Sequence, residues 1–384
     1  FGSSHCGREP TSRGRSIAMG CRQSRDSVGG PSACAGGKYA VSGAAETATA
    51  VPLLPAPADD VVPHACALGE SQFAVSGVDG WVYVYDWEKP RLAGKFRAHR
   101  KALNRLLPLS DGRLFTASAD ATVQLWGPGI GSGGCGGDDT GATPLQSFEG
   151  HRMSVSALDV VEDGDGSGSH LLFTGSRDCT VRLWDIATGK ELHQSKILRN
   201  VVTAVRRVPG GTPSVVQASE DLQFRIWDPR AGLRPAQAVH GGPNQLICVD
   251  VTDNGHYAVC GSKGFSRENC EVKVYDLRGG LRQLTAVPCA DQTIEALRIC
   301  AADHCLFAGK DGFIRAASLP DAKIVAERRG PGGSGYTALG VSRRPGSGPV
   351  AIAATMSPDG PELEVLAWSD EAMTGPAALL ASTH

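Results

Sequence analysis

Several features that would assign this 384-residue sequence to a common class are missing. The longest apolar runs fall well short of the ~18 residues that a membrane-spanning helix needs, and there is no apolar segment of the secretory signal type and no Asn-x-Ser/Thr glycosylation site. The twelve cysteines include no Cys-x-x-C pair and no cluster with zinc spacing, and several of them, such as Cys179 and Cys260, lie within apolar strand patterns. A net charge of −2 creates no global field that would attract nucleic acid. We therefore expect a soluble cytoplasmic protein with reduced thiols, without metal or cofactor, that does not bind nucleic acid.

What the sequence does contain is a repeat. Its clearest copy runs from Gly150-His151 to Trp184-Asp185, and the copies close at positions 86, 127, 185, 228 and 276, which are spaced by 41, 58, 43 and 48 residues. A Gly-His opening and a Trp-Asp closing at a period of roughly 40–45 residues are typical of WD-repeat propeller blades. Short β segments separated by turn residues fill each copy. The sequence therefore predicts an all-β fold, a seven-bladed WD-repeat β-propeller with a disordered N-terminal tail.

The composition places the domain boundaries. Residues 1–44 are rich in Gly, Ser and Arg, carry a net charge of +4 and contain almost no strand-forming residues. We expect a disordered basic tail at 1–44, a propeller at 45–370 and a C-terminal tail at 371–384. A closed propeller leaves no long strand edge exposed, so we also expect a monomer.

The seven blades are not all complete. Little strand signal follows Trp368, so the last blade has no outer strand of its own. The segment Ala48 to Leu54 is the candidate to complete it, and Pro52 is tolerable there only because an outermost strand leaves half of its backbone donors unpaired. Two insertions are expected as loops, at 127–143 and at 264–269.

The loop 127–143 matches the dinucleotide-binding pattern G-x-G-x-x-G at positions 131–136. The phosphate site in that motif needs a helix N-terminus, and no helix follows here. We interpret the segment as a flexible loop and predict no cofactor.

Two blades share a set of four polar or aromatic residues at matching offsets: His99, Thr116, Asp120 and Trp126 in blade 2, and His151, Thr174, Asp178 and Trp184 in blade 3. In WD-repeat proteins such residues form a hydrogen-bonded chain that ties the strands of a blade together. A hydrolase triad is the alternative, but a catalytic site would be single, whereas this set recurs at the blade period. We predict an architectural role and no enzymatic activity. Blades 1 and 4, where Tyr85 replaces Trp and Gln217 replaces Thr, are expected to be looser.

The N-terminal region contains a lipidation motif. Met19 begins the pattern M-G-x-x-x-S, the acceptor pattern for N-myristoylation. We expect translation to begin at Met19, with residues 1–18 coming from an upstream reading frame; if 1–18 belong to the mature protein, the motif is inactive. One acyl chain binds membranes only marginally, so a second signal is needed. The residues concerned are Gly20 and Cys21 as lipid attachment sites and Arg22 and Arg25 as contacts to an anionic leaflet.

Three segments carry a closer resemblance within the WD-repeat family. Residues 198–203, 217–230 and 264–278, the last including the insertion with its Gly-Phe and Cys-Glu, are similar to a member that acts at cilia. The likeness covers about 45–320 and is poor over the last blade. It implies a non-enzymatic scaffold in cilium assembly and ciliary membrane-protein trafficking. Its implied partners are intraflagellar transport and BBSome cargo adaptors and regulators of small ARF-like GTPases, at the membrane of the ciliary base.

Two other functions remain open. Trp227-Asp228-Pro229-Arg230 is a W-D-x-R box, and the segment ending at Arg278 is a near copy. In substrate receptors of cullin-RING ubiquitin ligases, Arg230 and Arg278 would reach the ligase adaptor, since the planar guanidinium suits paired hydrogen bonds; alternatively, they only cover the edge of the blade. A heterotrimeric G-protein β subunit would need an N-terminal coiled-coil helix, whereas residues 19–44 are rich in Gly and Ser.

Overall fold

The computed structural model describes residues 48–54, 61–69, 71–89, 91–129, 138–139, 142–162, 170–196, 201–210, 213–344, 347–357 and 360–368. Every described residue belongs to one compact unit of the chain, residues 41–384. These residues form 29 strands in seven sheets, with two short 3₁₀ turns at Pro229–Ala231 and Pro331–Gly333. The predicted all-β fold of seven blades is thus confirmed.

The first three blades follow one another along the chain. Blade 1 contains β2 (Ala65–Ala67), β3 (Gln72–Ser76), β4 (Trp81–Asp86), β5 (Arg91–Arg97) and the two-residue strand β9 (Asp138–Asp139). Blade 2 contains β6 (Leu103–Pro108), β7 (Leu114–Ser118), β8 (Thr122–Trp126) and β10 (Gln146–Glu149). Blade 3 contains β11 (Val155–Glu162), β12 (His170–Ser176), β13 (Thr180–Asp185) and β14 (Glu191–Lys196).

The other four blades repeat this order, and only the last borrows a strand from elsewhere. Blade 4 contains β15 (Val202–Val208), β16 (Ser214–Ser219), β17 (Gln223–Asp228) and β18 (Arg234–His240). Blade 5 contains β19 (Leu246–Val251), β20 (Tyr257–Ser262), β21 (Glu271–Asp276) and β22 (Arg282–Pro288). Blade 6 contains β23 (Ile294–Ala301), β24 (His304–Gly309), β25 (Phe313–Ser318) and β26 (Lys323–Arg329). Blade 7 contains β27 (Gly335–Arg344), β28 (Ser347–Ser357), β29 (Gly360–Trp368) and β1 (Ala48–Leu54).

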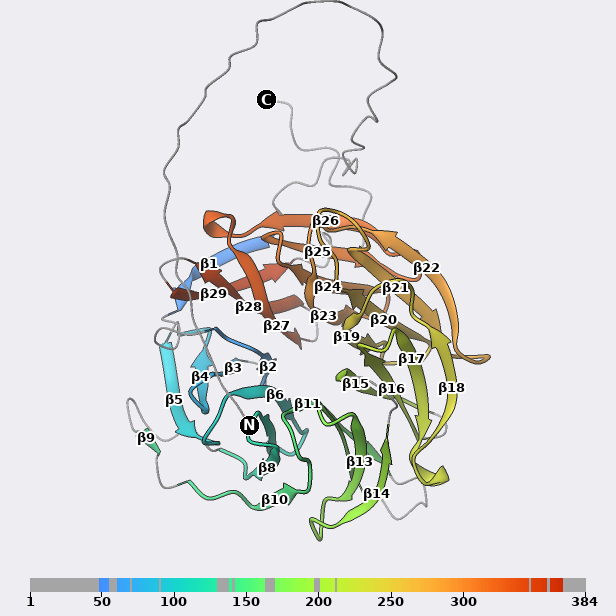
Figure 1. Cartoon of the computed structure of the whole chain (residues 1–384). Helices are drawn as coiled ribbons and strands as arrows, with labels where there is room; N and C mark the ends of the chain where they lie inside the picture. Colours follow the sequence, from blue (N-terminus) through green and yellow to red (C-terminus); the bar gives the residue numbers. More distant parts are fainter. Residues whose placement is uncertain are drawn as a thin grey trace, which may run out of the picture. The chain divides into compact units, whose positions relative to one another are not determined.

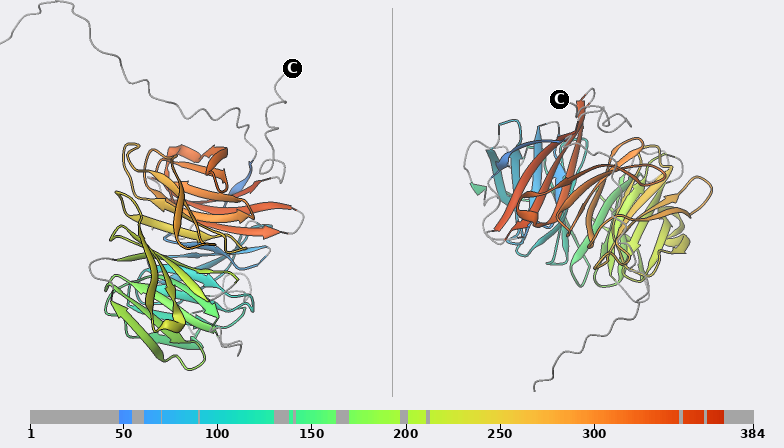
Figure 2. Two further views of the ribbon diagram at one scale, coloured as in Figure 1. Left: turned by 90° about the vertical axis from the view of Figure 1, so that its right-hand side faces the viewer. Right: turned by 90° about the horizontal axis from the view of Figure 1, so that it is seen from above.

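The seven sheets surround a central channel. The first strand of each blade packs against the first strand of the next, and the series β2, β6, β11, β15, β19, β23 and β27 closes when β27 contacts β2. Figure 1 shows these strands nearest the centre, and Figure 2 shows the sheets side by side in two further views. Closure of this kind leaves every sheet face covered by a neighbour.

The start of the described chain completes the last blade. β1 pairs antiparallel with β29, with Thr49 opposite Ala367, and the blue β1 lies beside the red β29 in Figure 1. The register shifts between Val51 and Leu54, the interval that contains Pro52. This confirms the predicted contribution of residues 48–54 to blade 7, and the irregularity falls at the residue that cannot donate a ladder hydrogen bond.

Apolar cores form between blades. One cluster joins Phe173 of blade 3 to the fully buried Trp227 of blade 4, and another joins Phe73 of blade 1 to Ile352 of blade 7. Close packing explains why some positions are small. A Cβ on Gly175 would lie 2.4 Å from a methyl carbon of Val202 in the next blade.

Two expectations are corrected by the structure. Cys179, taken as part of an apolar strand pattern, is half-buried in the β12–β13 turn with φ of +63°, because the residue after the turn aspartate must adopt the left-handed conformation. The loop 127–143 is not wholly irregular, since β9 within it pairs in parallel with β5 at Lys95 and Phe96. The tails at 1–44 and 371–384 lie outside the described residues.

Candidate functional site

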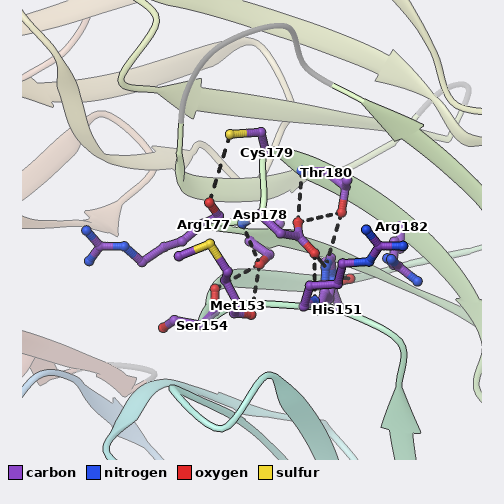
Figure 3. A network of polar contacts seen from close by, with 12 residues as sticks. His151, Met153, Ser154, Arg177, Asp178, Cys179, Thr180 and Arg182 are labelled. Carbon is purple, nitrogen blue, oxygen red and sulfur yellow. Dashed lines mark hydrogen bonds and ion pairs between the residues drawn. The ribbon is translucent and has the colours of Figure 1, made fainter. Parts of the chain in front are cut away.

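The most regular polar arrangement is the four-residue set of blade 3. His151 precedes β11, Thr174 lies on β12, Asp178 is in the β12–β13 turn and Trp184 lies on β13. The imidazole Nδ1 is 3.0 Å from Asp178 Oδ2, Nε2 is 2.8 Å from Thr174 Oγ1, and Trp184 Nε1 donates to the same hydroxyl at 2.9 Å. Figure 3 shows His151, Asp178 and Thr180 converging in this network. The chain of bonds ties the loop before the blade to its second and third strands.

Blade 2 repeats this geometry. His99 Nδ1 is 2.9 Å from Asp120 Oδ2, its Nε2 is 2.8 Å from Thr116 Oγ1, and Trp126 Nε1 donates to that hydroxyl at 3.0 Å. The two histidines, both threonines and both tryptophans are buried. The donors and acceptors of the histidines, threonines and tryptophans are used within each blade, and only the turn aspartates are partly exposed, with the Asp120 side chain at 19%.

The turn aspartates are strongly acidic. Burial alone would raise the pKa of Asp178, but hydrogen bonds from His151, from the Thr180 hydroxyl and from the Arg152 amide outweigh it and hold that pKa far below its usual value. The same balance, with His99 and Thr122 as the donors, lowers the pKa of Asp120. Both carboxylates therefore stay charged at neutral pH and cannot act as general acids there.

In other blades, a side chain on the third strand takes the place of the histidine as the partner of the turn aspartate. Tyr83 donates to Asp79 at 2.6 Å in blade 1. In blades 4 and 6 an arginine four residues after the aspartate forms an ion pair: Arg225 with Asp221 and Arg315 with Asp311. The indole of Trp227 donates to Gln217 Oε1 at 2.6 Å. The lower stability expected of blades 1 and 4 stays a prediction. Because the Tyr83–Asp79 and Arg225–Asp221 pairs stabilise the turns of these blades, the prediction needs an unfolding measurement.

The two W-D-x-R arginines point back at their own blades. Arg230 contacts Asp228 through Nε and Nη2 at 3.2 Å each, with its side chain 43% exposed. Arg278 contacts Asp276 at 3.0 and 2.7 Å and lies over the ring of Tyr257. Each guanidinium is oriented by its own aspartate, and both remain exposed for a partner.

A cavity with a volume of about 380 Å³ lies at one mouth of the central channel. The loop between β6 and β7 lines it, whereas the histidine–aspartate networks lie at the opposite ends of these strands. We call it the mouth pocket. Its charged residues are Arg113, Arg206, Arg207, Arg343, Asp111, Asp159, Asp250 and Asp253. Leu107, Val160 and Pro209 add apolar wall.

Most charges of the mouth pocket are satisfied within the protein. Arg113 pairs with Asp111 at 2.7 Å, and Arg206 pairs with Asp250 at 3.1 Å. Arg343 pairs with Asp253 and donates to Ile299 O at 2.7 Å. Burial raises the pKa of Asp159, although the Arg206 charge and two backbone amides oppose this.

Arg207 differs from the other arginines of the mouth pocket. It is exposed, and within the described part of the chain its guanidinium forms no hydrogen bond or ion pair, although its charge acts on Asp159 at longer range. It lies on β15 beside the buried Val205 and the paired Arg206. The sequence does contain a feature that indicates this site: the adjacent Arg206 and Arg207 interrupt the apolar pattern of a strand that lines the channel.

Other predicted site residues cannot be placed. Gly20, Cys21, Arg22 and Arg25 lie outside the described residues. Within the described ranges, no helix is long and apolar enough to cross a membrane, and no group of three His, Cys, Asp or Glu side chains could hold a metal ion. Of the described cysteines, eight are free thiols and all but Cys179 are buried.

Comparison with known proteins supports the repeat assignment. The family described as "WD domain, G-beta repeat" matches residues 90–127 and 142–185, which are parts of blades 1 to 3. The guanine nucleotide-binding protein subunit beta of Arabidopsis thaliana is 25% identical over 301 residues, covering 65% of this chain and 74% of that protein. The nuclear distribution protein PAC1 of Gibberella zeae is 30% identical over 125 residues, 31% of this chain.

Several of these likenesses cover only a small part of the relative. The chain covers only a quarter of the length of PAC1, and WD repeat-containing protein 81 of Homo sapiens, 32% identical over 194 residues, is covered over 9% of its length. The matched proteins carry different names and share the propeller repeat with this chain. The comparisons therefore support the repeat and the ring, and leave the partners to be found from the surface.

Proposed function

Because the chain is a seven-bladed WD-repeat β-propeller, we propose that it is a non-enzymatic scaffold that binds a segment of another protein at the mouth pocket. The observation that carries this proposal is the exposed guanidinium of Arg207, which forms no ion pair, at the rim of a cavity of about 380 Å³ whose wall is partly apolar. Such a combination of apolar surface and a few placed polar groups is what ligand pockets require.

The pocket defines the chemistry of the partner. Arg207 offers paired donors to a carboxylate, and the neighbouring Leu107 and Pro209 offer apolar contact. The remaining arginines are already neutralised by aspartates, so a densely acidic ligand gains little from them. The best match is an extended segment with one acidic residue beside an apolar one.

Proximity labelling with a charge-reversed pocket tests this proposal. Arg207→Glu should remove a subset of the proteins labelled by the wild type, because a carboxylate at this position repels the partner's acidic residue. The matched control is Arg234→Glu on β18, an exposed arginine outside the pocket, which should label the wild-type set. Identical sets for all three proteins would rule out the pocket as the docking site.

The finer assignment is also a proposal. We propose that the scaffold is related to WD repeat-containing protein 31 and acts in cilium assembly and ciliary membrane-protein trafficking, with intraflagellar transport or BBSome adaptors and regulators of small ARF-like GTPases as partners. Its support is the resemblance over residues 198–203, 217–230 and 264–278. Localisation of the tagged protein to the base of a cilium would support it, and a uniform cytoplasmic distribution in ciliated cells would count against it.

Membrane tethering forms a separate part of the proposal. If translation begins at Met19, Gly20 is the acceptor for a myristoyl chain and Cys21 for a palmitoyl chain. Intact-mass measurement of the native protein should show the acyl group, and Gly20→Ala should lack it and leave the membrane fraction. A native mass that includes residues 1–18, or an unmodified Gly20, would refute the proposed membrane tether.

A ubiquitin-ligase receptor is the second candidate. Two observations favour it: Arg230 and Arg278 share one geometry, and each is about half exposed at the end of its blade. In that case the ligase adaptor should co-purify with the wild type and be lost with Arg230→Ala. If no adaptor co-purifies, these arginines serve only to hold the blade edge.

A further inference from the structure

Three arginines from alternate blades meet inside the central channel. Arg105 lies on β6, Arg206 on β15 and Arg298 on β23, which belong to blades 2, 4 and 6. All three line one cavity of about 10 Å³, together with Ala204 and Val249 of the channel wall. Like charges held this close, with apolar neighbours, repel one another more strongly than they would in water.

Two of these arginines have only uncharged partners. Arg105 donates to the carbonyl oxygens of Ser156 at 3.0 Å and Thr203 at 3.2 Å. Arg298 donates to Leu297 O at 2.8 Å and to His64 Nε2 at 2.6 Å. A charge removed from water is normally held in an ion pair, whereas these two half-buried guanidinium groups form none and are acted on by Asp250 and Glu295 only at longer range.

The histidine beside them supplies no charge. Burial and the nearby arginines lower the pKa of His64 well below its usual value, so the ring is neutral and accepts from Arg298. Burial, followed by the charges of Arg298 and Arg206, lowers the pKa of Arg105 to about 9. Arg105 is therefore still charged at neutral pH, in an environment that disfavours its charge.

The other titratable groups near the cavity do not balance the cluster. Arg206 takes both nearby aspartates, Asp250 at 3.1 Å and Asp159 at 4.0 Å. Glu295 acts on Arg105 at longer range and pairs with Lys310 at 3.0 Å.

Two buried thiols also face the cluster and remain neutral. Burial raises the pKa of Cys66 and of Cys248 to about 12, so neither is a thiolate at neutral pH. The two close carboxylates are both paired with Arg206, and Glu295 acts only from longer range, so Arg105 and Arg298 have no ion pair of their own among the described residues.

We propose that the channel binds one small monovalent anion of the halide class, chloride under physiological conditions, between Arg105 and Arg298. The cavity of about 10 Å³ has room for roughly one water-sized particle, which excludes phosphate or a peptide carboxylate with its chain. A halide ion is somewhat larger than water and enters with a small shift of the flexible arginine side chains. The anion accepts from guanidinium hydrogens that the carbonyl oxygens do not use. It links blades 2 and 6 across the channel, and so it stabilises the closed ring.

Thermal unfolding at constant ionic strength tests the proposal. Replacing sodium gluconate by sodium chloride should raise the Tm by about 2 °C or more and then saturate, because an ion that binds only the folded state stabilises it by mass action. Arg105→Gln should abolish this chloride-specific rise. Arg234→Gln, an exposed arginine on β18, should retain it in full. Equal chloride responses in the wild type and Arg105→Gln would overturn the proposal.

Bromide provides a second measurement that does not depend on how a variant folds. Wild-type crystals grown in sodium bromide should show one anomalous peak in contact with the guanidinium groups of Arg105 and Arg298. A channel with well-ordered side chains and no bromide peak at this position would refute the site. If Arg105→Gln does not fold, the same chloride titration of Arg298→Gln and the bromide measurement test the proposed anion site.

Discussion

At the scale of single residues, the polar networks of blades 2 and 3 are closed systems. Thr174 receives a hydrogen bond from Trp184 and contacts His151, whose other nitrogen meets Asp178. Thr174, His151 and Trp184 are buried, so water does not replace a hydrogen-bond partner that one of them loses. Removing one member therefore lowers the free energy of unfolding mainly because its neighbours are left buried without a hydrogen-bond partner.

Thr174→Val should show this penalty. Valine has nearly the same shape, but the Trp184 N–H and the His151 Nε2 lose their partner, so the free energy of unfolding should fall by about 2–4 kcal/mol. Thr285→Val, on the outer strand β22, is the control and should change it by less than about 0.5 kcal/mol. Urea unfolding measures both, and equal losses would contradict the network's role.

The pKa of Asp178 makes the same network sensitive to acid. A carboxylate whose folded pKa lies below its unfolded value of about 3.9 contributes stability above that value, and this contribution is lost as the pH falls towards the folded pKa. Asp178→Asn should therefore lower stability at pH 7 and flatten its decline below about pH 5. The exposed Asp321→Asn should keep the wild-type slope in urea unfolding at a series of pH values. An unchanged slope in Asp178→Asn would contradict the assignment.

At the scale of the blade, small residues allow neighbouring sheets to approach. Gly175 on β12 faces Val202 of the next blade, and Gly261 on β20 faces Ile294 in the same way. A Cβ on Gly261 would lie 2.6 Å from a methyl carbon of Ile294. The repeated contact indicates that the spacing between blades is set by backbone-to-side-chain packing.

Gly175→Ala should therefore destabilise the protein by about 1–3 kcal/mol, because its Cβ would lie 2.7 Å from Val202 Cβ, an atom fixed to the backbone. Combining it with Val202→Ala should recover part of the loss, and a double-mutant cycle of unfolding free energies measures the coupling. If the effects of the two substitutions on the free energy of unfolding are strictly additive, the contact between residues 175 and 202 does not cause the destabilisation.

The sequence predicted the blades better than the contacts within them. Trp184-Asp185 and its copies located five blades because the period survives where single residues do not. The pairs Tyr83–Asp79 and Arg225–Asp221 were not predicted, since a different side chain performs the task in each blade and no repeat connects them. Cys179 was misjudged because its turn conformation depends on the preceding aspartate.

At the scale of the whole ring, the candidate binding site depends on contacts between distant segments. The mouth pocket combines Arg113 of blade 2, Arg207 of blade 4 and Arg343 of blade 7, which lie far apart in the sequence. No local pattern shows that they meet, although arginines in strands that line the channel are a usable signal. The motif at Gly20 is local, and its role stays a prediction because it lies outside the described residues.

The ring exists only if its first and last strands share one sheet, so truncation tests the account most directly. A chain of residues 45–384 retains β1, and a chain of 61–384 lacks it and leaves β29 as an open edge. We predict that 45–384 unfolds at the same temperature as the full chain, whereas the Tm of 61–384 is lower by about 10 °C or more. Cooperative unfolding of 61–384 at the unchanged Tm would contradict closure by β1 and, with it, the propeller on which the proposed function depends.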